Sequence, residues 1–306
     1  MDRLKKQKSL LFLILFFNIS NIFSQIEQDL RPERYDTILV CHINFDKAIS
    51  NADNYKVIRL YRDFCTFDKI KLFHYFKNVH TLTINSSALK TIPIEVLELP
   101  NLTNVEFINC PNLNYEDILN VLSKEKIKKI HLSNVKLKEI PESLFLFLEL
   151  EELYLYNNNL KKLNEEIGNL KKLNILNISQ NKIKRLPTSF EELKNLIYLD
   201  LSDNPIFYKL DTSQFFLFTQ LTNIQILSIS NTKLKIFPYF LKNLEHLYNL
   251  DIRNNPIDFL PENQDGFMAL EILNVYCTKI KQVPERFKLQ AGNYNGWLQY
   301  GSKSCR

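Results

Sequence analysis

The sequence predicts an α/β solenoid, a curved, horseshoe-shaped array with a parallel β-sheet on its concave side and short irregular or helical returns on its convex side. Three observations predict this fold class. One pattern of apolar residues recurs through most of the 306 residues. Each copy alternates apolar and polar residues, as a strand with one buried face does. No single copy could bury that face alone, so the copies must stack into one continuous core.

The first 24 residues have the layout of a secretory signal peptide. Basic residues precede an apolar run from Leu10 to Phe17, and a polar stretch then leads to an expected cleavage site after Ser24. The alternative is an uncleaved membrane anchor, but the apolar stretch is shorter than the about 20 residues that a spanning helix needs. Removing residues 1–24 deletes four basic residues and one acidic residue, so the formal net charge falls from +5 to +2. We therefore expect no binding to nucleic acid.

Residues 25–56 are expected to form an N-terminal segment with a cap helix from Phe45 to Asn54. The repeats then occupy residues 57–290, in about ten units. The first unit, which begins with Val57-x-x-Leu60, is degenerate because Arg62 falls where an apolar inward residue is expected. Residues 291–306 form a C-terminal cap or tail. Terminal units of a solenoid are commonly atypical because one of their faces meets solvent.

The recurring pattern is L-x-x-L-x-L-x-x-N-x-L-x-x-L-P. Six of the eight intervals between successive units are 23 residues long. This pattern resembles the leucine-rich repeat family, in the class whose units have about 23 residues. The resemblance implies a non-enzymatic protein that recognises another macromolecule on its concave face. The units begin at Val79, Leu102, Ile127, Leu150, Leu173, Leu196, Ile224, Leu247 and Leu270.

The ninth position of each unit carries specific structural information. In the leucine-rich repeat family an asparagine there is buried and hydrogen-bonds the backbone of neighbouring turns. We expect this role for asparagine, part of it for serine and threonine, and only tolerance for cysteine, whereas valine cannot hydrogen-bond at all. In the order of the units, the residues are Ser87, Cys110, Val135, Asn158, Asn181, Asn204, Thr232, Asn255 and Thr278.

The returns are expected to differ between units. Around residues 110–135 the ninth positions are poor and the interval lengthens to 25 residues, so we expect irregular geometry there. Asn114 precedes the segment Tyr115 to Leu122, which reads as an N-cap and a true helix. Units with proline should have shorter and less helical returns. These prolines are Pro141, Pro187, Pro238, Pro261 and Pro284.

The composition argues against catalysis. The chain has only five glycines, the first at position 168, so neither the glycine motif of dinucleotide sites nor that of serine hydrolases is present. The five histidines are scattered, without the cysteine and histidine spacing of zinc sites. We expect no catalytic residue, no cofactor and no metal.

The five cysteines leave at least one thiol unpaired. Cys110, at a ninth position, is the candidate for a buried free thiol. Cys41 could pair with Cys65, and Cys277 with Cys305, so that each disulfide staples one end of the solenoid. The alternative is that all five cysteines are reduced.

The third, fifth, seventh and eighth positions of each unit should point outward on the concave sheet. Two groups stand out among them. Tyr154, Tyr156 and Tyr198 are of a residue type enriched at binding hot spots, although cross-strand packing would also explain them. A neighbouring charged group could receive a basic ligand group or be solvated, and it comprises Asp200, Asp203, Asp251 and Arg253.

The twelfth position predicts a row of lysines along one edge of the solenoid, which we call the basic rim. A polyanion or an anionic membrane surface would suit this row. The alternative is a solvated face that keeps the protein soluble. Asp258 interrupts the row, whose members are Lys90, Lys138, Lys161, Lys184, Lys235 and Lys281.

Together these features predict an exported binding protein, secreted, periplasmic or at the cell surface, whose partner is another protein or a cell-surface macromolecule. Beyond residues 1–24, no segment is apolar enough to span a membrane. One alternative is a structural or adhesive component of the cell envelope whose basic rim holds an anionic surface. Another is an effector delivered into a second cell.

Overall fold

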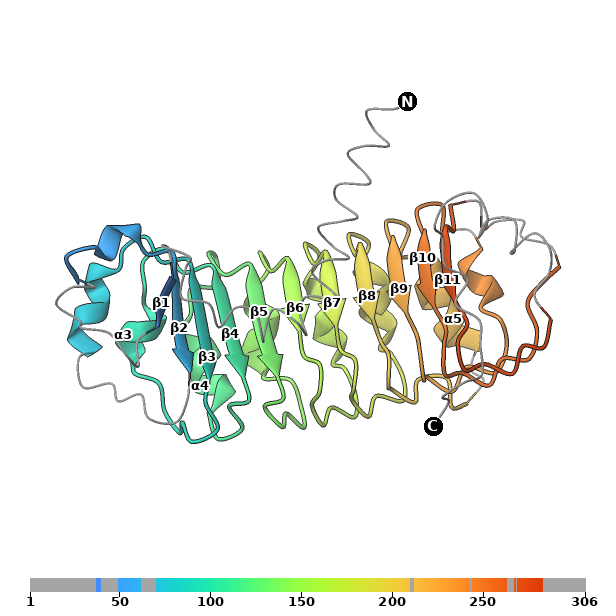
Figure 1. Ribbon diagram of the computed structural model, residues 1–306, viewed down its shortest axis with the longest axis horizontal. Coiled ribbons are helices and arrows are strands. Elements are labelled where there is room, and N and C mark those ends of the chain that lie inside the picture. The colour runs from blue at the N-terminus through green and yellow to red at the C-terminus, as the bar shows by residue number, and fades with distance from the viewer. Residues whose placement is uncertain are drawn as a thin grey trace, which may run out of the picture.

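The computed structural model describes residues 37–39, 49–61, 70–209, 212–242, 244–262, 267 and 269–282. The expected signal peptide, the first four residues of the expected cap helix and the C-terminal residues 291–306 lie outside the described residues. The described strands stand side by side in one row from β1 to β11 (Figure 1). The helices lie in the segments that return from one strand to the next, away from the concave face of the sheet (Figure 1).

Eleven strands in the described part of the chain form one parallel sheet in which every strand pairs with the next one in sequence. This arrangement confirms the predicted solenoid. The strands are β1 (Thr37–Leu39), β2 (Val57–Tyr61), β3 (Thr81–Asn85), β4 (Asn104–Ile108), β5 (Lys129–Ser133), β6 (Glu152–Tyr154), β7 (Ile175–Asn177), β8 (Tyr198–Asp200), β9 (Ile226–Ser228), β10 (Asn249–Asp251) and β11 (Ile272–Asn274).

Equivalent positions of successive units pair across the sheet. Leu153, for example, pairs with Leu176, which pairs with Leu199, and all three are fully buried. Phenylalanines from the returns, such as Phe147 and Phe190, fill the same interior and are also fully buried. Alternation along the strand thus places the fourth and sixth positions in one core that runs the length of the solenoid.

The returns contain three α-helices and several 3-10 helices among the described residues. Asn114 caps α4 as predicted, since its Oδ1 accepts from the N–H groups of Glu116 and Asp117. Pro141, Pro187 and Pro238 each precede a 3-10 helix, which confirms the less helical returns. The elements are η2 (Ala52–Asn54), η3 (Ile70–Tyr75), α3 (Ile94–Leu97), α4 (Tyr115–Val121), η4 (Glu142–Leu146), η5 (Glu165–Asn169), η6 (Thr188–Glu192), α5 (Thr212–Thr219) and η7 (Tyr239–Leu241).

The asparagines at the ninth position form the predicted ladder. Asn204, 1% exposed, accepts from the N–H of Ile183 at 2.9 Å and donates to the carbonyls of Ile178 and Leu201 at 2.9 and 3.2 Å. Threonine at the ninth position makes only part of this pattern, as at Thr232, whose hydroxyl donates to the carbonyl of Ile229 in the same unit at 2.7 Å. The backbone in each turn therefore gains partners that the sheet does not supply.

The ladder departs from expectation in the unit that begins at Val79. Ser87 was expected to fill part of it, but Ser87 is exposed, and Ser86 is buried instead. The N–H of Ser86 donates to the Sγ of Cys110 at 3.4 Å. The ladder position of this unit is therefore shifted by one residue, from Ser87 to Ser86.

The eighth position of most units adopts the left-handed conformation. Its φ is 55° at Asn157, 55° at Gln180, 56° at Asp203 and 56° at Asn254. Asparagine and aspartate tolerate this conformation because their short polar side chains hydrogen-bond locally. Each turn is therefore made without glycine, which explains why the chain has so few.

The first unit has a different register from the expected one. Ile58 pairs with Leu82 and Leu60 with Ile84, and both residues of β2 are buried. The unit therefore begins two residues earlier than Val57, and Arg62, on which the expectation rested, lies outside the described residues. The sheet also extends one strand further, to β1, inside the segment that was expected to form only the cap.

The cysteines are partly described. Cys110 is buried and free, as expected. Cys277 is disulfide-bonded, but its partner lies outside the described residues. The specific pair of Cys277 with Cys305 therefore stays a prediction, as does the pair of Cys41 with Cys65, neither of which is described.

Candidate protein-binding surface

The concave face is built from columns of outward side chains that continue from strand to strand. The fifth position shows this register most clearly, since each of its members pairs with the equivalent residue of the next strand. Neighbouring strands lie about 4.8 Å apart, so the members of one column are in contact range. From β3 to β11 the column reads Thr83, Glu106, His131, Tyr154, Asn177, Asp200, Ser228, Asp251 and Asn274.

Tyr154 and Tyr156 meet at one point of this face. Both are half-buried, and their ring centroids lie 5.2 and 5.3 Å from that of His131 on β5. The hydroxyl of Tyr154 donates to Glu152 at 3.1 Å, and the Nζ of Lys129 lies 5.3 Å from its ring centroid. Cross-strand packing therefore accounts for Tyr154, whereas the hydroxyl of Tyr156 makes no hydrogen bond within the described residues.

Tyr198 does not join these two tyrosines. It lies on β8, two strands from β6, and is half-buried. Burial and the neighbouring carboxylate of Asp200 raise the pKa of its hydroxyl. The hydroxyl of Tyr198 is therefore influenced mainly by its burial and by the acidic group, and also by Tyr154 of the aromatic pair.

A charged network lies beside His131. The Nζ of Lys129 is 2.7 Å from Glu106, which also accepts from the hydroxyl of Thr83 at 2.9 Å. Burial alone would raise the pKa of Glu106, but Lys129 and His131 hold it below its ordinary value. Burial alone would likewise lower the pKa of Lys129, but Glu106 and Glu152 raise it. Both groups are therefore charged at neutral pH.

His131 itself is kept neutral. Burial lowers its pKa to about 4, against the opposing influence of Glu106. Its Nε2 and the Oγ of Ser133, two residues further along β5, are buried and have no hydrogen-bond partner in the described part of the chain. Such unpaired buried groups are rare in native proteins and call for an explanation.

The predicted acidic group has a structural role in addition to any ligand contact. The Oδ1 of Asp200 accepts from the N–H and the hydroxyl of Ser202, at 2.9 and 2.6 Å. The Oδ1 of Asp251 accepts in the same way from the N–H of Arg253 at 3.1 Å, and its Oδ2 lies 2.9 Å from the Arg253 Nε. The fifth position thus caps the seventh wherever it is aspartate or asparagine.

The two aspartates at the fifth position have one strand between them, as the column of fifth positions predicts. Asp200 on β8 and Asp251 on β10 are separated by Ser228 on β9, whose hydroxyl is 2.5 Å from that of Ser202. Asp203 lies at the left-handed turn, is exposed, and accepts from Asn231 at 2.7 Å. Burial raises the pKa of Asp251 to about 6, and it also raises the pKa of Asp200.

The basic rim lies along the edge at which the strands end. Its six lysines, from Lys90 to Lys281, are all exposed. The row is broken at Asp258 and also at Phe207, which occupies the twelfth position of its unit but is buried. The rim is therefore a discontinuous set of positive charges.

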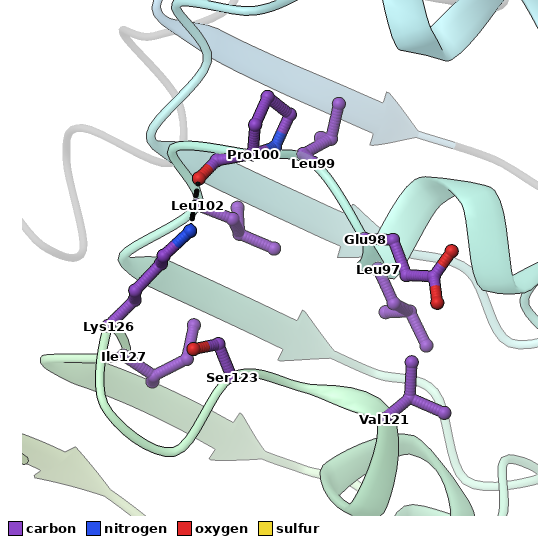
Figure 2. Close-up of a pocket in the computed structure, with 9 residues that line it drawn as sticks. All are labelled: Leu97, Glu98, Leu99, Pro100, Leu102, Val121, Ser123, Lys126 and Ile127. Carbon is purple, nitrogen blue, oxygen red and sulfur yellow. Dashed lines mark hydrogen bonds between the residues drawn. The ribbon is translucent and has the colours of Figure 1, made fainter.

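The structure has a pocket on the side of the returns that the repeat pattern of the sequence did not predict. It has a volume of about 290 Å³ and lies where the returns of two units meet, between the end of α3 and the end of α4. Figure 2 shows Lys126 closing one side through a hydrogen bond of 2.9 Å to the carbonyl of Pro100. The floor is apolar, formed by buried residues such as Leu102 and Ile127. Nothing in its lining indicates catalysis.

Within the described ranges, no cluster of three histidine, cysteine, aspartate or glutamate residues could hold a metal ion. Every helix in those ranges is too short or too polar to traverse a bilayer.

Comparison with known proteins agrees with the repeat. A family model for the leucine rich repeat matches residues 149–206. No curated protein matches the chain. A leucine-rich repeat protein of Leptospira interrogans is 20% identical with a TM-score of 0.61, and the match covers 82% of this chain and 80% of that one.

Two further solved structures extend the comparison. An internalin of Listeria monocytogenes is 18% identical with a TM-score of 0.53, over 77% of this chain and 65% of the internalin. A chain of the Toll–Spatzle complex of Drosophila is 17% identical with a TM-score of 0.63, over 84% of this chain and 35% of that one. At these identities the likeness concerns the fold alone.

Proposed function

Because the chain is a leucine-rich repeat protein, we propose that it recognises another protein on its concave face, with Tyr156 at the centre of the contact. One observation carries this choice of position. Tyr156 packs on His131 and continues the column of Ser133, and His131 and Ser133 supply two of the three buried side-chain atoms that lack a hydrogen-bond partner among the described residues, the third being the Oγ of Ser143 on η4.

The energetics favour a partner at this point. An unpaired buried polar group costs about 1–3 kcal/mol, and a bound chain that supplies a hydroxyl or an amide to these atoms would recover that free energy. The ring of Tyr156 lies against the ring of His131, is only half-buried, and carries a hydroxyl that makes no hydrogen bond within the described residues. A partner can therefore shift this ring without breaking a hydrogen bond.

The surroundings are already rigid. Tyr154 is held by Glu152 and Lys129, and Lys129 is held in turn by Glu106. A platform whose side chains are fixed before binding loses little conformational entropy when it binds. The comparison with the Toll–Spatzle complex supports protein recognition by a fold of this kind.

We propose further that residues 1–24 direct export, that the protein acts outside the cytoplasm, and that it binds its partner without catalysing a reaction. The layout of basic, apolar and polar residues in this segment supports export. Mass determination of the protein recovered from its native cells should give a mature form that begins at Gln25. A full-length mass would contradict cleavage.

Binding can be tested by a cross-linking pull-down from native cells with the immobilised protein. The wild type should capture one protein in stoichiometric amount. Tyr156→Ala should weaken that capture by about 1–2 kcal/mol, or about 5- to 30-fold in Kd, because truncation of a tyrosine hot spot has this effect. The melting temperature should change little.

Tyr75→Ala is a matched control, since Tyr75 is 44% exposed and lies on η3 in a return segment. It should leave the capture unchanged. If Tyr154→Ala, Tyr156→Ala and Tyr198→Ala all bind the captured protein as tightly as the wild type does, the concave tyrosines have no role in recognition.

A further inference from the structure

The thirteenth position of the units changes character along the solenoid. In the five units that begin between Val79 and Leu173, the residue at this position is polar or charged, as at Lys162 and Arg185. In the next three it is apolar and exposed, with Tyr208 at 66%, Ile236 at 38% and Phe259 at 52%. We call these three residues the apolar stripe.

The three residues belong to neighbouring turns. They follow β8, β9 and β10, which pair with one another, on the edge of the molecule where the strands end (Figure 1). The N–H of Phe207 donates to the carbonyl of Thr232 at 3.0 Å, which holds the turn of Tyr208 against the turn that leads to Ile236. Units about 4.8 Å apart place the three side chains in one row.

The solenoid fold does not require apolar side chains here. The equivalent position tolerates lysine or arginine in the preceding units, and the core residues Leu234 and Phe237 on either side of Ile236 are buried without its help. Large apolar side chains gathered at one exposed place mark an interaction site more often than side chains scattered singly.

Positive charges flank the stripe. Lys209 follows Tyr208 in sequence, and Lys233 and Lys235 precede Ile236, and all three are exposed. None of these lysines forms an ion pair within the described residues. Asp258, next to Phe259, is an acidic exception in the stripe's immediate surroundings. The local balance is therefore positive, next to apolar side chains.

We propose that the apolar stripe and its flanking lysines dock the protein on an anionic membrane surface. Aromatic and aliphatic side chains that enter the boundary between headgroups and acyl chains, with lysines beside them, are the features of interfacial membrane binding. A row of three units spans about 10 Å, which is narrow for a specific protein interface of about 800 Å² per partner. A soluble polyanion would engage the lysines and leave the stripe in water.

This surface is separate from the concave face, so the proposal does not depend on the proposed function. The test is co-sedimentation of the full chain with vesicles of phosphatidylcholine, with and without phosphatidylglycerol. Wild-type protein should bind the vesicles that contain phosphatidylglycerol, and binding should fade with added salt. The double variant Ile236→Ser and Phe259→Ser should bind at least about 10-fold more weakly, because buried apolar area drives insertion.

The chain offers a matched control for this variant. Leu146 and Leu148 are 58% and 56% exposed, on the return of a unit far from the stripe. Their double substitution by serine should leave vesicle binding unchanged. Since the apolar segment near the N-terminus is common to every variant, a difference between variants reports the stripe alone.

Charge has its own pair of variants. Lys233→Gln with Lys235→Gln should weaken binding to anionic vesicles about 5-fold for each lysine. Lys90→Gln with Lys138→Gln removes the same charge from the distant part of the basic rim and should have a smaller effect. These four lysine side chains are exposed, so the glutamine variants should fold normally. They therefore test the proposal even if the serine variant proves unstable.

Three outcomes would overturn the proposal. One is the absence of binding to anionic vesicles. Another is full binding by the serine variant together with loss in the lysine variants, which would assign the surface to soluble polyanions such as heparin. The third is a wild-type dimer in light scattering that the serine variant converts to a monomer, since the stripe would then join two copies of the chain.

Discussion

The asparagine ladder makes a quantitative prediction about three residues that look equivalent in sequence. Asn158, Asn181 and Asn204 are all buried at the ninth position. Replacing each by alanine removes the same amide but leaves different backbone groups unpaired. The cost should therefore follow the number of groups that lose their last hydrogen-bond partner, at about 1–3 kcal/mol each.

Asn158 should matter most. Its Oδ1 accepts from the N–H groups of Val135 and Leu137, at 3.1 and 3.0 Å, and its Nδ2 donates to the carbonyl of Leu132 at 2.7 Å. Val135 has no side-chain group that could compensate. Asn158→Ala thus leaves three backbone groups without these partners and should lower the free energy of unfolding by about 3 kcal/mol or more.

Asn181 should matter least. Its Oδ1 accepts only from the N–H of Leu160, and the carbonyls of Leu155 and Ile178 that it contacts also receive bonds from Asn158 and Asn204. One backbone group is left unpaired, which costs about 1–3 kcal/mol. The loss of unfolding free energy in Asn204→Ala should lie between those of the other two variants, because this substitution also removes the hydrogen bond to the carbonyl of Leu201.

Urea unfolding followed by circular dichroism measures these differences, with unchanged m-values as the check that the unfolded state is the same. Asn195→Ala is the control, because this exposed asparagine makes a single hydrogen bond of 2.8 Å to Lys171. It should change the free energy of unfolding by less than about 0.5 kcal/mol. Equal losses for Asn158→Ala and Asn181→Ala would refute the reasoning, since the ladder would then act only through its packing.

Two other predictions concern burial. At Gly168 an added Cβ would lie 2.6 Å from the carbonyl oxygen of Ser189, so Gly168→Ala should lower the melting temperature by overpacking. Alanine at the exposed neighbour Asn169 should not. The pKa of His131 is lowered to about 4, so its contribution to stability is present above the unfolded pKa of about 6.5 and lost as pH falls toward 4. The pKa of Asp251 is raised to about 6, so its contribution is lost as pH rises from about 4 to 6. His131→Gln and Asp251→Asn should therefore change the pH dependence of unfolding in opposite directions, and parallel profiles would contradict both assignments.

The features that repeat could be predicted from sequence alone. Alternating leucines located the inward face of the strands, and the spacing of Asn114 before an apolar run located the N-cap of α4. These predictions succeed because each depends on a few neighbouring residues whose chemistry has one stable solution. The helix α5 was missed, although the 28-residue interval around it was visible in the sequence.

The features that depend on a neighbouring unit were harder to predict. Ser86 replaces Ser87 in the interior, and its N–H contacts the Sγ of Cys110 one unit further along. The capping role of Asp200 and Asp251 depends on backbone geometry at the seventh position. Sequence indicated which residues face outward, but not which of them bind one another.

The concave face differs along the solenoid both in the length of the strands and in the residue at the fifth position. Where it is asparagine or aspartate, in β7, β8, β10 and β11, its side chain takes the N–H of the seventh residue, and the strand is three residues long. In β3, β4 and β5 it is threonine, glutamate or histidine, and the strands run to five residues.

Tyr154, the last residue of β6, and Tyr156, two residues beyond that strand, lie at the junction between these two parts. There the longer ladder ends, and the buried Nε2 of His131 and Oγ of Ser133 find no partner among the described residues. The apolar stripe lies instead in the other part, at the turns that follow β8 to β10. A regular array satisfies its own hydrogen bonds and buries its own apolar side chains, so the places where it fails to do so are those at which a partner gains the most free energy by binding.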